Sequence, residues 1–255
     1  MERILLRNGI PEPMPRIEGT YLYQTLHVRG RRPLWLDRHT ELLARNIQEL
    51  FGLRWAPDLR RLEAEIATLL DANRHPVAGS SFVRMAFTPA GDLLLIPGAV
   101  SLYDGYTLRS LRPAAAVVNY GVPYPEYPTS AREAAVELAR QYAGLQGASV
   151  AVRCDRNGTL MAADEAALFA IRGRRVYAPP GEASIGRSLA VRSIRAAGLE
   201  LAASPVGRDD LPRMDELFFI DHRGVTALSR CDGQPYMAIF AERIAGALRG
   251  LFPNM

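Results

Sequence analysis

The basic side chains of this chain are suited to binding anions, but none of them can form an imine. All 31 residues that count as lysine or arginine are arginine, so the 255-residue chain has no side-chain primary amine. A guanidinium stays protonated, donates hydrogen bonds to carboxylates and phosphates, and does not act as an amine nucleophile. Gradual replacement of lysine by arginine explains the arginines at most surface positions, where only the positive charge matters. The composition still excludes any reaction that needs a catalytic lysine.

Two side chains of the first third of the chain are candidate ligand-binding groups. Arg84 lies in an apolar run that predicts a strand, where it could bind an anion. An exposed strand arginine is an equally good interpretation. Tyr23 shares a predicted strand face with Tyr21 and could line a cleft between lobes, although packing is the commoner role of such rings.

The histidines and cysteines give weaker signals. His222 follows Asp221 and could act as a general base beside a carboxylate, but adjacent residues of a strand point to opposite faces. Cys154 and Cys231 are too few for a disulfide scaffold or a zinc site, which needs about four ligands. We expect both to be small buried side chains in a reducing compartment, and we expect no metal site.

The charge distribution argues against nucleic acid and membrane partners. The net charge is +4, but the arginines are scattered, and the only doublets are Arg31-Arg32, Arg60-Arg61 and Arg174-Arg175. The first residues lack the apolar core of a signal peptide, and no apolar run approaches membrane-spanning length. A cytoplasmic protein is therefore expected.

The elements that must position these residues follow from the apolar periodicity. In the first part of the chain, strands are predicted at 21–28, 81–87 and 92–96, with a helix capped near Asp37 and a second helix at about 57–70 that turns Leu59 inward. In the second part of the chain, a helix is predicted from about Ser130, with an apolar stripe formed by Ala135, Leu138, Ala139 and Tyr142. Hairpins are predicted at 155–158 and 172–174, helices near 186–197 and 234–249, and strands near 217–220 and 225–228.

Three prolines in residues 120–129 exclude the interior of a helix there and indicate a connection between two domains. The predicted organisation is an N-terminal α/β lobe at 1–119, a Pro-rich linker at 120–129 and a C-terminal lobe at 130–255. Hairpins mixed with helices predict an α+β chain in two lobes rather than a doubly wound parallel sheet.

Short sequence motifs, and their order along the chain, resemble those of the class IV aminotransferases. This fold type IV pyridoxal-phosphate family includes branched-chain and D-amino-acid aminotransferases and aminodeoxychorismate lyase. The motifs are Tyr23-Gln24-Thr25-Leu26, the hairpin from Arg29 to Leu36, His39-x-x-Leu42-Leu43, Arg84 to Phe87, Asp155 to Phe169, Ile185 to Ser188, Asp215 to Phe219 and Asp232 to Pro235. The resemblance implies a two-lobed fold like that of D-amino-acid aminotransferase, and a homodimer whose site borrows residues from its partner.

The same resemblance implies where cofactor contacts would lie. The Schiff-base lysine of the family falls at Ser130, or at Thr129 if the alignment slips by one residue. The carboxylate that pairs with the pyridine nitrogen falls at Ala162, with Asp164 and Glu165 close by, and the family's asparagine falls at Ala167.

The phosphate contacts of the family differ as well. Its helix arginine corresponds to Leu42, with Arg45 one turn later, and its Thr-Gly-Thr segment corresponds to residues 220–222, which include the Asp221 carboxylate. The Gly-Ile-Thr turn reads Gly186-Arg187-Ser188, so a residual anion cradle at a helix N-terminus is expected there.

Together these positions predict a class IV aminotransferase-like protein that does not catalyse pyridoxal-phosphate chemistry and binds a small anion or a protein partner. No cofactor is expected, and pyridoxal phosphate enters only through the resemblance. The alternative is a diverged aminotransferase or aminodeoxychorismate-lyase-type enzyme that binds the cofactor non-covalently. A third interpretation is an interaction subunit of a neighbouring enzyme.

Overall fold

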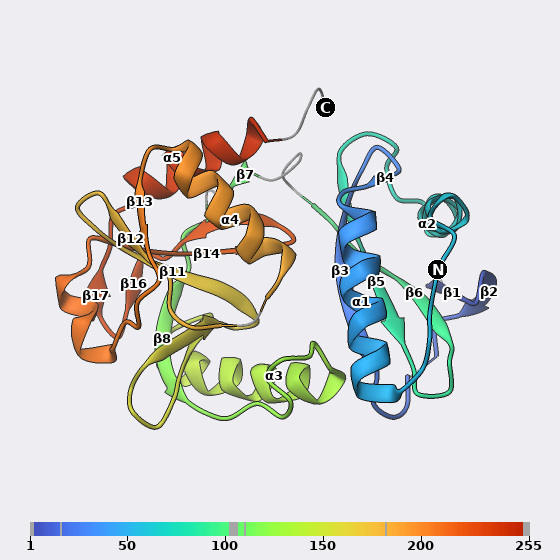
Figure 1. Cartoon of the computed structure of the whole chain (residues 1–255), viewed down its shortest axis with the longest axis horizontal. Helices are drawn as coiled ribbons and strands as arrows, with labels where there is room; N and C mark the ends of the chain where they lie inside the picture. Colours follow the sequence, from blue (N-terminus) through green and yellow to red (C-terminus); the bar gives the residue numbers. More distant parts are fainter. Residues whose placement is uncertain (1–2, 16, 102–106, 110, 182, 252–255) are drawn as a thin grey trace. The chain divides into compact units, whose positions relative to one another are not determined.

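The computed structural model describes residues 3–15, 17–101, 107–109, 111–181 and 183–251. Its contacts divide the chain into two compact units (Figure 1). The first unit comprises Met1–Gly105 and Tyr127–Ala131, and the second comprises Tyr106–Glu126 and Arg132–Met255. The Pro-rich segment at 120–129 thus contributes residues to both units. Within the part of the chain described, no helix is long and apolar enough to span a membrane.

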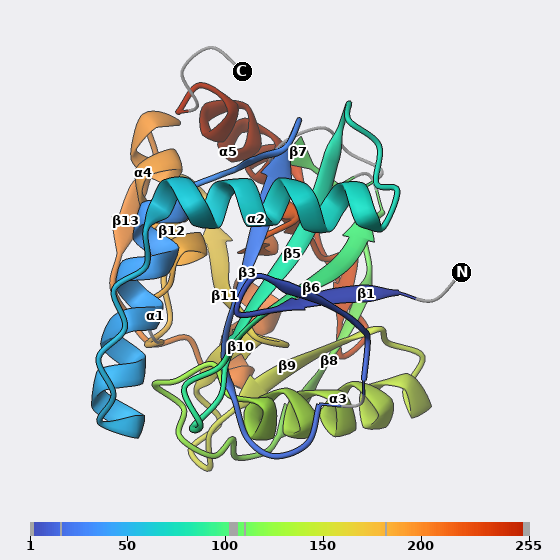
Figure 2. The same ribbon diagram turned by 90° about the vertical axis from the view of Figure 1, so that its right-hand side faces the viewer.

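The first unit is an antiparallel sheet covered on one face by two helices. Among the described residues its six strands run in the order β2-β1-β6-β5-β3-β4. Their bounds are β1 Ile4–Arg7, β2 Ile10–Pro13, β3 Leu22–Arg29, β4 Arg32–Pro33, β5 Ser80–Phe87 and β6 Leu93–Val100; the helices are α1 Leu36–Phe51 and α2 Leu59–Ala72. Figure 2 shows α2 crossing the strands of this sheet.

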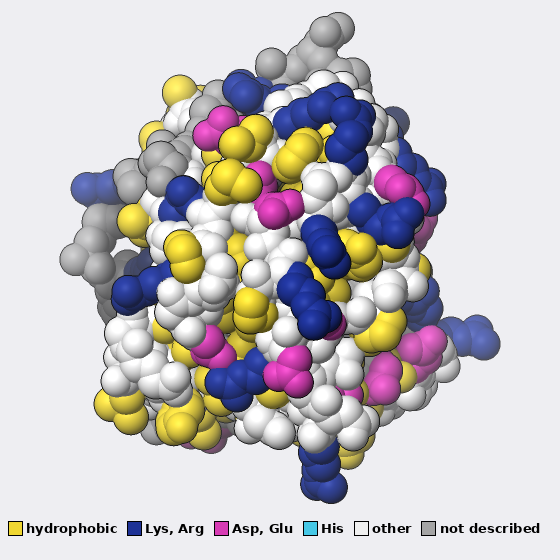
Figure 3. Space-filling model, turned by 90° about the vertical axis from the view of Figure 1, so that its left-hand side faces the viewer, with side chains coloured by type: hydrophobic (Ala, Val, Ile, Leu, Met, Phe, Trp, Pro, Cys, Tyr) yellow, Lys and Arg dark blue, Asp and Glu magenta, His cyan; other side chains and the backbone are white. Residues whose placement is uncertain are grey.

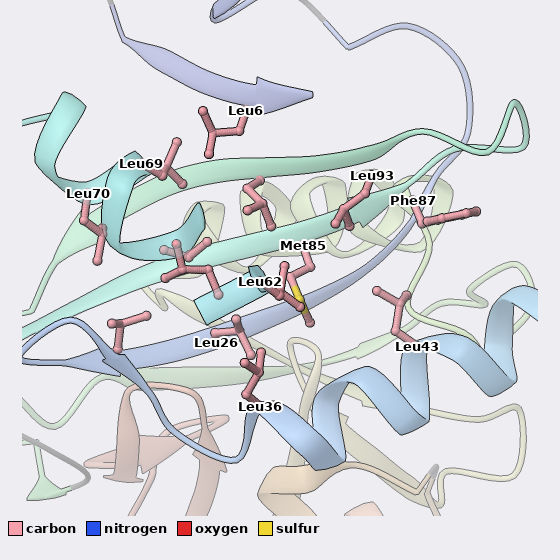
Figure 4. Packing of buried hydrophobic residues seen from close by; sticks show 14 of the residues in the cluster. Leu6, Leu26, Leu36, Leu43, Leu62, Leu69, Leu70, Met85, Phe87 and Leu93 are labelled. Atoms are coloured by element: carbon pink, nitrogen blue, oxygen red, sulfur yellow. The ribbon is translucent and has the colours of Figure 1, made fainter. Parts of the chain in front are cut away.

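Leucines dominate the core between this sheet and its helices. Leu43 of α1 and Leu62 and Leu69 of α2 point toward Leu26 of β3 and Met85 of β5 (Figure 4). All five side chains are at most 2% exposed. Burial of this apolar area is the main force that holds the helices on the sheet.

Both helices begin differently from the sequence prediction. α1 starts at Leu36, one residue before the expected cap at Asp37, because Trp35 adopts a left-handed conformation (φ 58°) and ends the preceding hairpin. In α2 the N-cap is Asp58, whose carboxylate accepts hydrogen bonds from the backbone N–H groups of Arg60 and Arg61. Leu59 is then the first helical residue and is 40% exposed, not turned inward.

The second unit is a larger mixed sheet. Within the described residues it has eleven strands, with the order β17-β16-β8-β9-β10-β11-β14-β15-β7, and β12 and β13 join it through β11. The strands are β7 Thr107–Leu108, β8 Ala114–Asn119, β9 Val150–Cys154, β10 Leu160–Ala163, β11 Ala166–Arg172, β12 Arg175–Tyr177, β13 Glu200–Ala202, β14 Glu216–Asp221, β15 Gly224–Ala227, β16 Arg230–Cys231 and β17 Gln234–Pro235. The helices are α3 Ser130–Leu145, α4 Ile185–Ala196 and α5 Ile239–Arg249, with a short 3₁₀ helix, η1, at Arg208–Arg213.

Helix α3 connects β8 to β9, which pair in parallel and therefore need a crossover. Its buried positions are Arg132, Val136, Ala139 and Ala143. Of the predicted stripe only Ala139 is buried, whereas Leu138 and Tyr142 are 67% and 55% exposed. The buried face of α3 is therefore turned by about one residue from the predicted stripe, because it includes the charged residue Arg132, which the apolar pattern did not indicate.

The start of α5 depends on a buried carboxylate. Glu216 of β14 is 0% exposed. Its two oxygens accept hydrogen bonds from the backbone N–H groups of Phe240 and Ala241, at 2.8 and 2.9 Å. These N–H groups lie in the first turn of α5, where no intrahelical partner exists, and the negative charge also favours the helix N-terminus. Glu216 therefore joins β14 to the helix that packs beside it.

Both cysteines lie in the core of the second unit. Cys154 is 4% exposed and Cys231 is 0% exposed. Burial raises the pKa of both thiols, and the pKa of Cys231 reaches about 12 because Asp232 adds to the effect of burial while Arg208 opposes it. A thiol of this kind carries almost no thiolate at neutral pH.

Replacing Glu216 is expected to destabilise the second unit. Glu216→Ala removes two charge-assisted hydrogen bonds and should lower the free energy of unfolding by about 3 kcal/mol, and Glu216→Gln by about 1 kcal/mol, because one acceptor oxygen remains. Urea unfolding followed by circular dichroism measures both values. Glu242→Gln is the control, since Glu242 is an exposed carboxylate in the first turn of the same helix. Equal effects of Glu216→Gln and Glu242→Gln would contradict the capping role.

Thiol labelling should find both cysteines protected. With Ellman's reagent at pH 8, the native protein is expected to react at neither thiol within minutes, and the protein in 6 M guanidinium chloride at both. The physical reason is the low thiolate fraction and the exclusion of the reagent from the core. Rapid labelling of one equivalent in the native state would show that one of these side chains is accessible.

Candidate functional site

Strand register brings three of the positions implied by the resemblance side by side. Ala162 of β10 lies opposite Ala167 of β11, and Ala167 lies opposite Ile220 of β14. On the other side of Ala162, β9 places Arg153 directly opposite it. Residues at paired positions of adjacent strands share one face of a sheet and lie about 5 Å apart at Cβ. We call Arg153, Ala162, Ala167 and Ile220 the site row.

The site row is mostly hydrocarbon. Ala162 and Ile220 are 3% and 1% exposed, and Ala167 is half-buried. Arg153, at 7% exposed, supplies the only charge of the row. Sequence reasoning did not single out Arg153; its signal is an arginine within the otherwise apolar strand β9.

A second row on the same face is aromatic. Phe169 and Phe218 lie opposite each other on β11 and β14, with ring centroids 5.1 Å apart and planes at 16°. The guanidinium carbon of Arg187 lies 6.0 Å from the centroid of Phe169, within cation–π range. Arg187 also donates from Nη2 to the carbonyl of Pro179 at 2.8 Å. A second guanidinium is therefore held over this face.

The predicted anion cradle lies at the first turn of α4, next to the end of the site row. A Cβ on Gly186 would lie 2.8 Å from the carbonyl oxygen of Ile220, so the helix can approach β14 only with glycine there. Ser184 caps the helix by accepting from the N–H of Arg187 through Oγ and from the N–H of Ser188 through its carbonyl. Two backbone donors of the cradle are thus engaged inside the helix.

The positions that would hold the Schiff-base lysine belong to the first unit. Ser130 accepts a hydrogen bond at Oγ from the N–H of Tyr21, at 3.2 Å, and its own N–H donates to the carbonyl of Tyr21. Thr129 is 1% exposed and forms a β-bridge with Leu22. Both residues tie the segment that leads into α3 to the beginning of β3.

The structure pairs two ligand candidates that the sequence identified separately. The guanidinium carbon of Arg84 lies 4.5 Å from the centroid of the Tyr23 ring, a cation–π contact between β5 and β3. Val83 and Met85 alternate with Arg84 and face the helices, so Arg84 and Tyr23 lie on the opposite face of the first sheet.

The carboxylate of the Asp221–His222 pair is bound by the neighbouring Arg223. Asp221 accepts from the backbone N–H of Arg223 through Oδ1 and from Nε and Nη2 of Arg223 through Oδ2. Burial alone would raise the pKa of Asp221, but His222 and Arg223 together outweigh it and hold this pKa below its usual range. The carboxylate is thereby neutralised by Arg223.

The carboxylates next to Ala162 have structural contacts of their own. Asp164 accepts from the N–H of Ala151 through Oδ1 and pairs with Arg140 of α3 through Oδ2, at 3.2 Å. Burial raises the pKa of Asp164, and Arg140 opposes this. The carbonyl of Glu165 accepts from Arg132, another buried arginine that sequence reasoning did not single out.

These residues do not fit pyridoxal phosphate. The chain offers no lysine, and the site row presents methyl and alkyl groups where a carboxylate and an amide would be needed. Leu42, which the resemblance places where the family has its phosphate-binding arginine, is half-buried, and Arg45 is exposed. The described residues also contain no cluster of three or more histidine, cysteine, aspartate or glutamate side chains that could hold a metal ion.

Comparisons with known proteins agree with the resemblance seen in the sequence. Residues 21–222 match the family model described as amino-transferase class IV. No curated protein sequence matches the chain.

Solved structures match the chain over nearly its whole length. They include a branched-chain aminotransferase from the archaeon Thermoproteus uzoniensis (TM-score 0.81, 16% identity, 98% of this chain and 94% of that one). A branched-chain amino acid aminotransferase from Escherichia coli has a TM-score of 0.80 at 17% identity, over 99% and 95% of the two chains. A candidate 4-amino-4-deoxychorismate lyase from Legionella pneumophila has a TM-score of 0.75 at 14% identity, over 90% of each chain. At these identities the likeness shows the fold alone.

Proposed function

The chain belongs to the class IV aminotransferase family, and on that premise we propose that it is a non-catalytic member that binds a small anion on the face of the second sheet. The observation that carries the proposal is the site row. Three positions that the resemblance assigns to cofactor contacts are neighbours on one face, and all three are alanine or isoleucine. Changes that concern one ligand and lie together in space are best explained as one loss of function.

The charges on this face favour an anion over a pyridine ring. Arg153 lies opposite Ala162, where the resemblance places the carboxylate that would keep the ring nitrogen protonated. A protonated nitrogen beside a guanidinium would meet a like charge in a buried setting, which disfavours its charged form. An oxyanion there would instead gain charge-assisted hydrogen bonds.

Arg187 extends this positive region toward the first turn of α4. Its guanidinium lies over the Phe169 ring, and the backbone N–H of Gly186 is at the N-terminus of the helix, where the macrodipole favours negative charge. We propose that the anion lies between this turn and the site row. Assembly as a homodimer belongs to the same proposal and rests on the family alone.

The alternative is an enzyme that binds pyridoxal phosphate without a covalent bond. It needs a carboxylate near Ala162, and Asp164 is the nearest in sequence. Both oxygens of Asp164 are engaged, one by Ala151 and one by Arg140, so recruiting it requires breaking these contacts. The structure therefore supports the non-catalytic interpretation better, and the cofactor test below separates the two.

Mixing the purified protein with pyridoxal phosphate is expected to give no new absorbance band. Reduction with borohydride is expected to leave no cofactor covalently attached within residues 21–222. The reason is the absence of a side-chain amine and of a partner for the ring nitrogen. Peptide mapping is needed because the α-amino group of Met1 is itself a primary amine. A melting temperature raised by pyridoxal phosphate together with an amino acid, with oxo-acid formed, would favour the alternative enzyme.

Titration with inorganic phosphate at constant ionic strength tests the anion site directly. The amide resonances of Gly186 and Ser188 are expected to shift with saturation in ¹⁵N-labelled protein, and Arg187→Gln should weaken this binding about tenfold, since a charge-assisted hydrogen bond is lost. Arg195→Gln is the matched control, because Arg195 is an exposed arginine in the last turn of the same helix. Shifts that do not saturate, or that are equal in the two variants, would contradict the proposal.

A further inference from the structure

A cavity of about 350 Å³ opens in the second unit, away from the site row. It lies between the end of α3, the first residues of β8 and the turn from β16 to β17. The polar groups and glycines that line it are Gln146, Gly147, Arg208, Arg230, Asp232 and Gly233, and alanines form the rest. None of these residues belongs to the site row or to the first turn of α4. The volume falls at the lower end of the range of small-molecule sites.

One wall of the cavity is fixed by the turn between β16 and β17. Asp232 and Gly233 form a two-residue loop with φ of 48° and 84°, the left-handed pair that a tight hairpin needs. Asp232 Oδ1 accepts from the N–H of Val117, at 2.8 Å, where β16 no longer pairs with β8. The carboxylate is therefore held in one position by the sheet.

Asp232 in turn positions a guanidinium. Its Oδ2 lies 2.6 Å from Nη2 of Arg208, which comes from the start of η1. Nη2 of Arg230, which also lines the cavity, lies 3.4 Å from the carbonyl oxygen of Gly147. Each contact uses one donor group of a side chain that has five N–H donors. Within the described part of the chain these are the only hydrogen bonds and ion pairs of the Arg208 and Arg230 side chains.

The cavity carries a net positive charge. Two guanidinium groups face one carboxylate, and the amide of Gln146 adds a donor and an acceptor. On the face seen in Figure 3, basic side chains lie among acidic and hydrophobic ones.

We propose that this cavity binds a small molecule with an oxyanion head group, a carboxylate or a phosphate, and that Arg208 and Arg230 hold that group. The fixed carboxylate of Asp232 keeps the Arg208 guanidinium in place before the ligand binds, which lowers the entropy cost of binding. Alanines of β8 leave room for the body of the ligand, and the Gln146 amide can bind a hydroxyl or amide on it. The site is independent of the anion proposed at the first turn of α4.

Inorganic phosphate and succinate, titrated separately into ¹⁵N-labelled full-length protein at constant ionic strength, test this site. At least one of them is expected to shift the amide resonances of Gly147 and Gly233 with saturation. Arg208→Gln and Arg230→Gln should each weaken that binding about tenfold. Arg213→Gln, which removes an exposed arginine from the same 3₁₀ helix outside the cavity, should leave it unchanged.

Three outcomes would overturn the proposal. They are the absence of saturable shifts at Gly147 and Gly233 with both probes, equal binding in Arg208→Gln and Arg213→Gln, and binding that survives in the double variant of Arg208 and Arg230. Shifts at Gly186 without shifts at Gly147 would overturn this site while supporting the one at α4. Because different amides report on the two sites, the failure of either proposal is distinguishable from failure of the other.

Discussion

The backbone hydrogen bonds between β9, β10, β11 and β14 are the constraint on which the site depends. In a sheet a shift of one residue in register moves every side chain to the opposite face, so the pairing of Arg153, Ala162, Ala167 and Ile220 fixes which chemistry the face presents. The apolar core on the other face, with Leu168 and Phe219 among its members, holds this register in place. The composition of the face is thus a consequence of packing as much as of sequence.

With this strand register, the face of the second sheet that carries the site row does not fit pyridoxal phosphate. Hydrocarbon groups occupy the positions where hydrogen-bonding partners would be needed, and the charges nearby are guanidinium groups. The carboxylates in the same region are engaged elsewhere: Asp164 with Arg140, and Asp221 with Arg223. A buried charge needs a partner, and these pairs satisfy that need inside the protein. The fold of the family is thus retained around a face whose described charges are paired guanidinium and carboxylate groups.

Arginine is also the common element of the two proposed sites. The planar guanidinium group of arginine allows one N–H to bind the protein while others are available to a ligand, as proposed for Arg208 and Arg230. Its flat surface also packs on aromatic rings, as at Arg187 and Arg84. Lysine, with a compact charge on a flexible stem, does not combine these contacts in the same way. A chain whose Lys and Arg positions are all arginine is limited in covalent chemistry but well supplied for anion recognition.

The sequence by itself determined the absence of a side-chain amine. It also determined the class of the fold and most element positions, because apolar periodicity and turn residues act locally. It did not determine the start of α1, where Trp35 is the N-cap, or the buried face of α3, which includes Arg132 and leaves Leu138 exposed. Only the tertiary structure showed that Ala162, Ala167 and Ile220 are neighbours, that Arg153 lies beside them, and that Arg208 and Arg230 line one cavity. The physical reason is that strand register and loop placement join residues far apart in the chain, and hydrogen-bonding partners at that distance leave no periodic trace in the sequence.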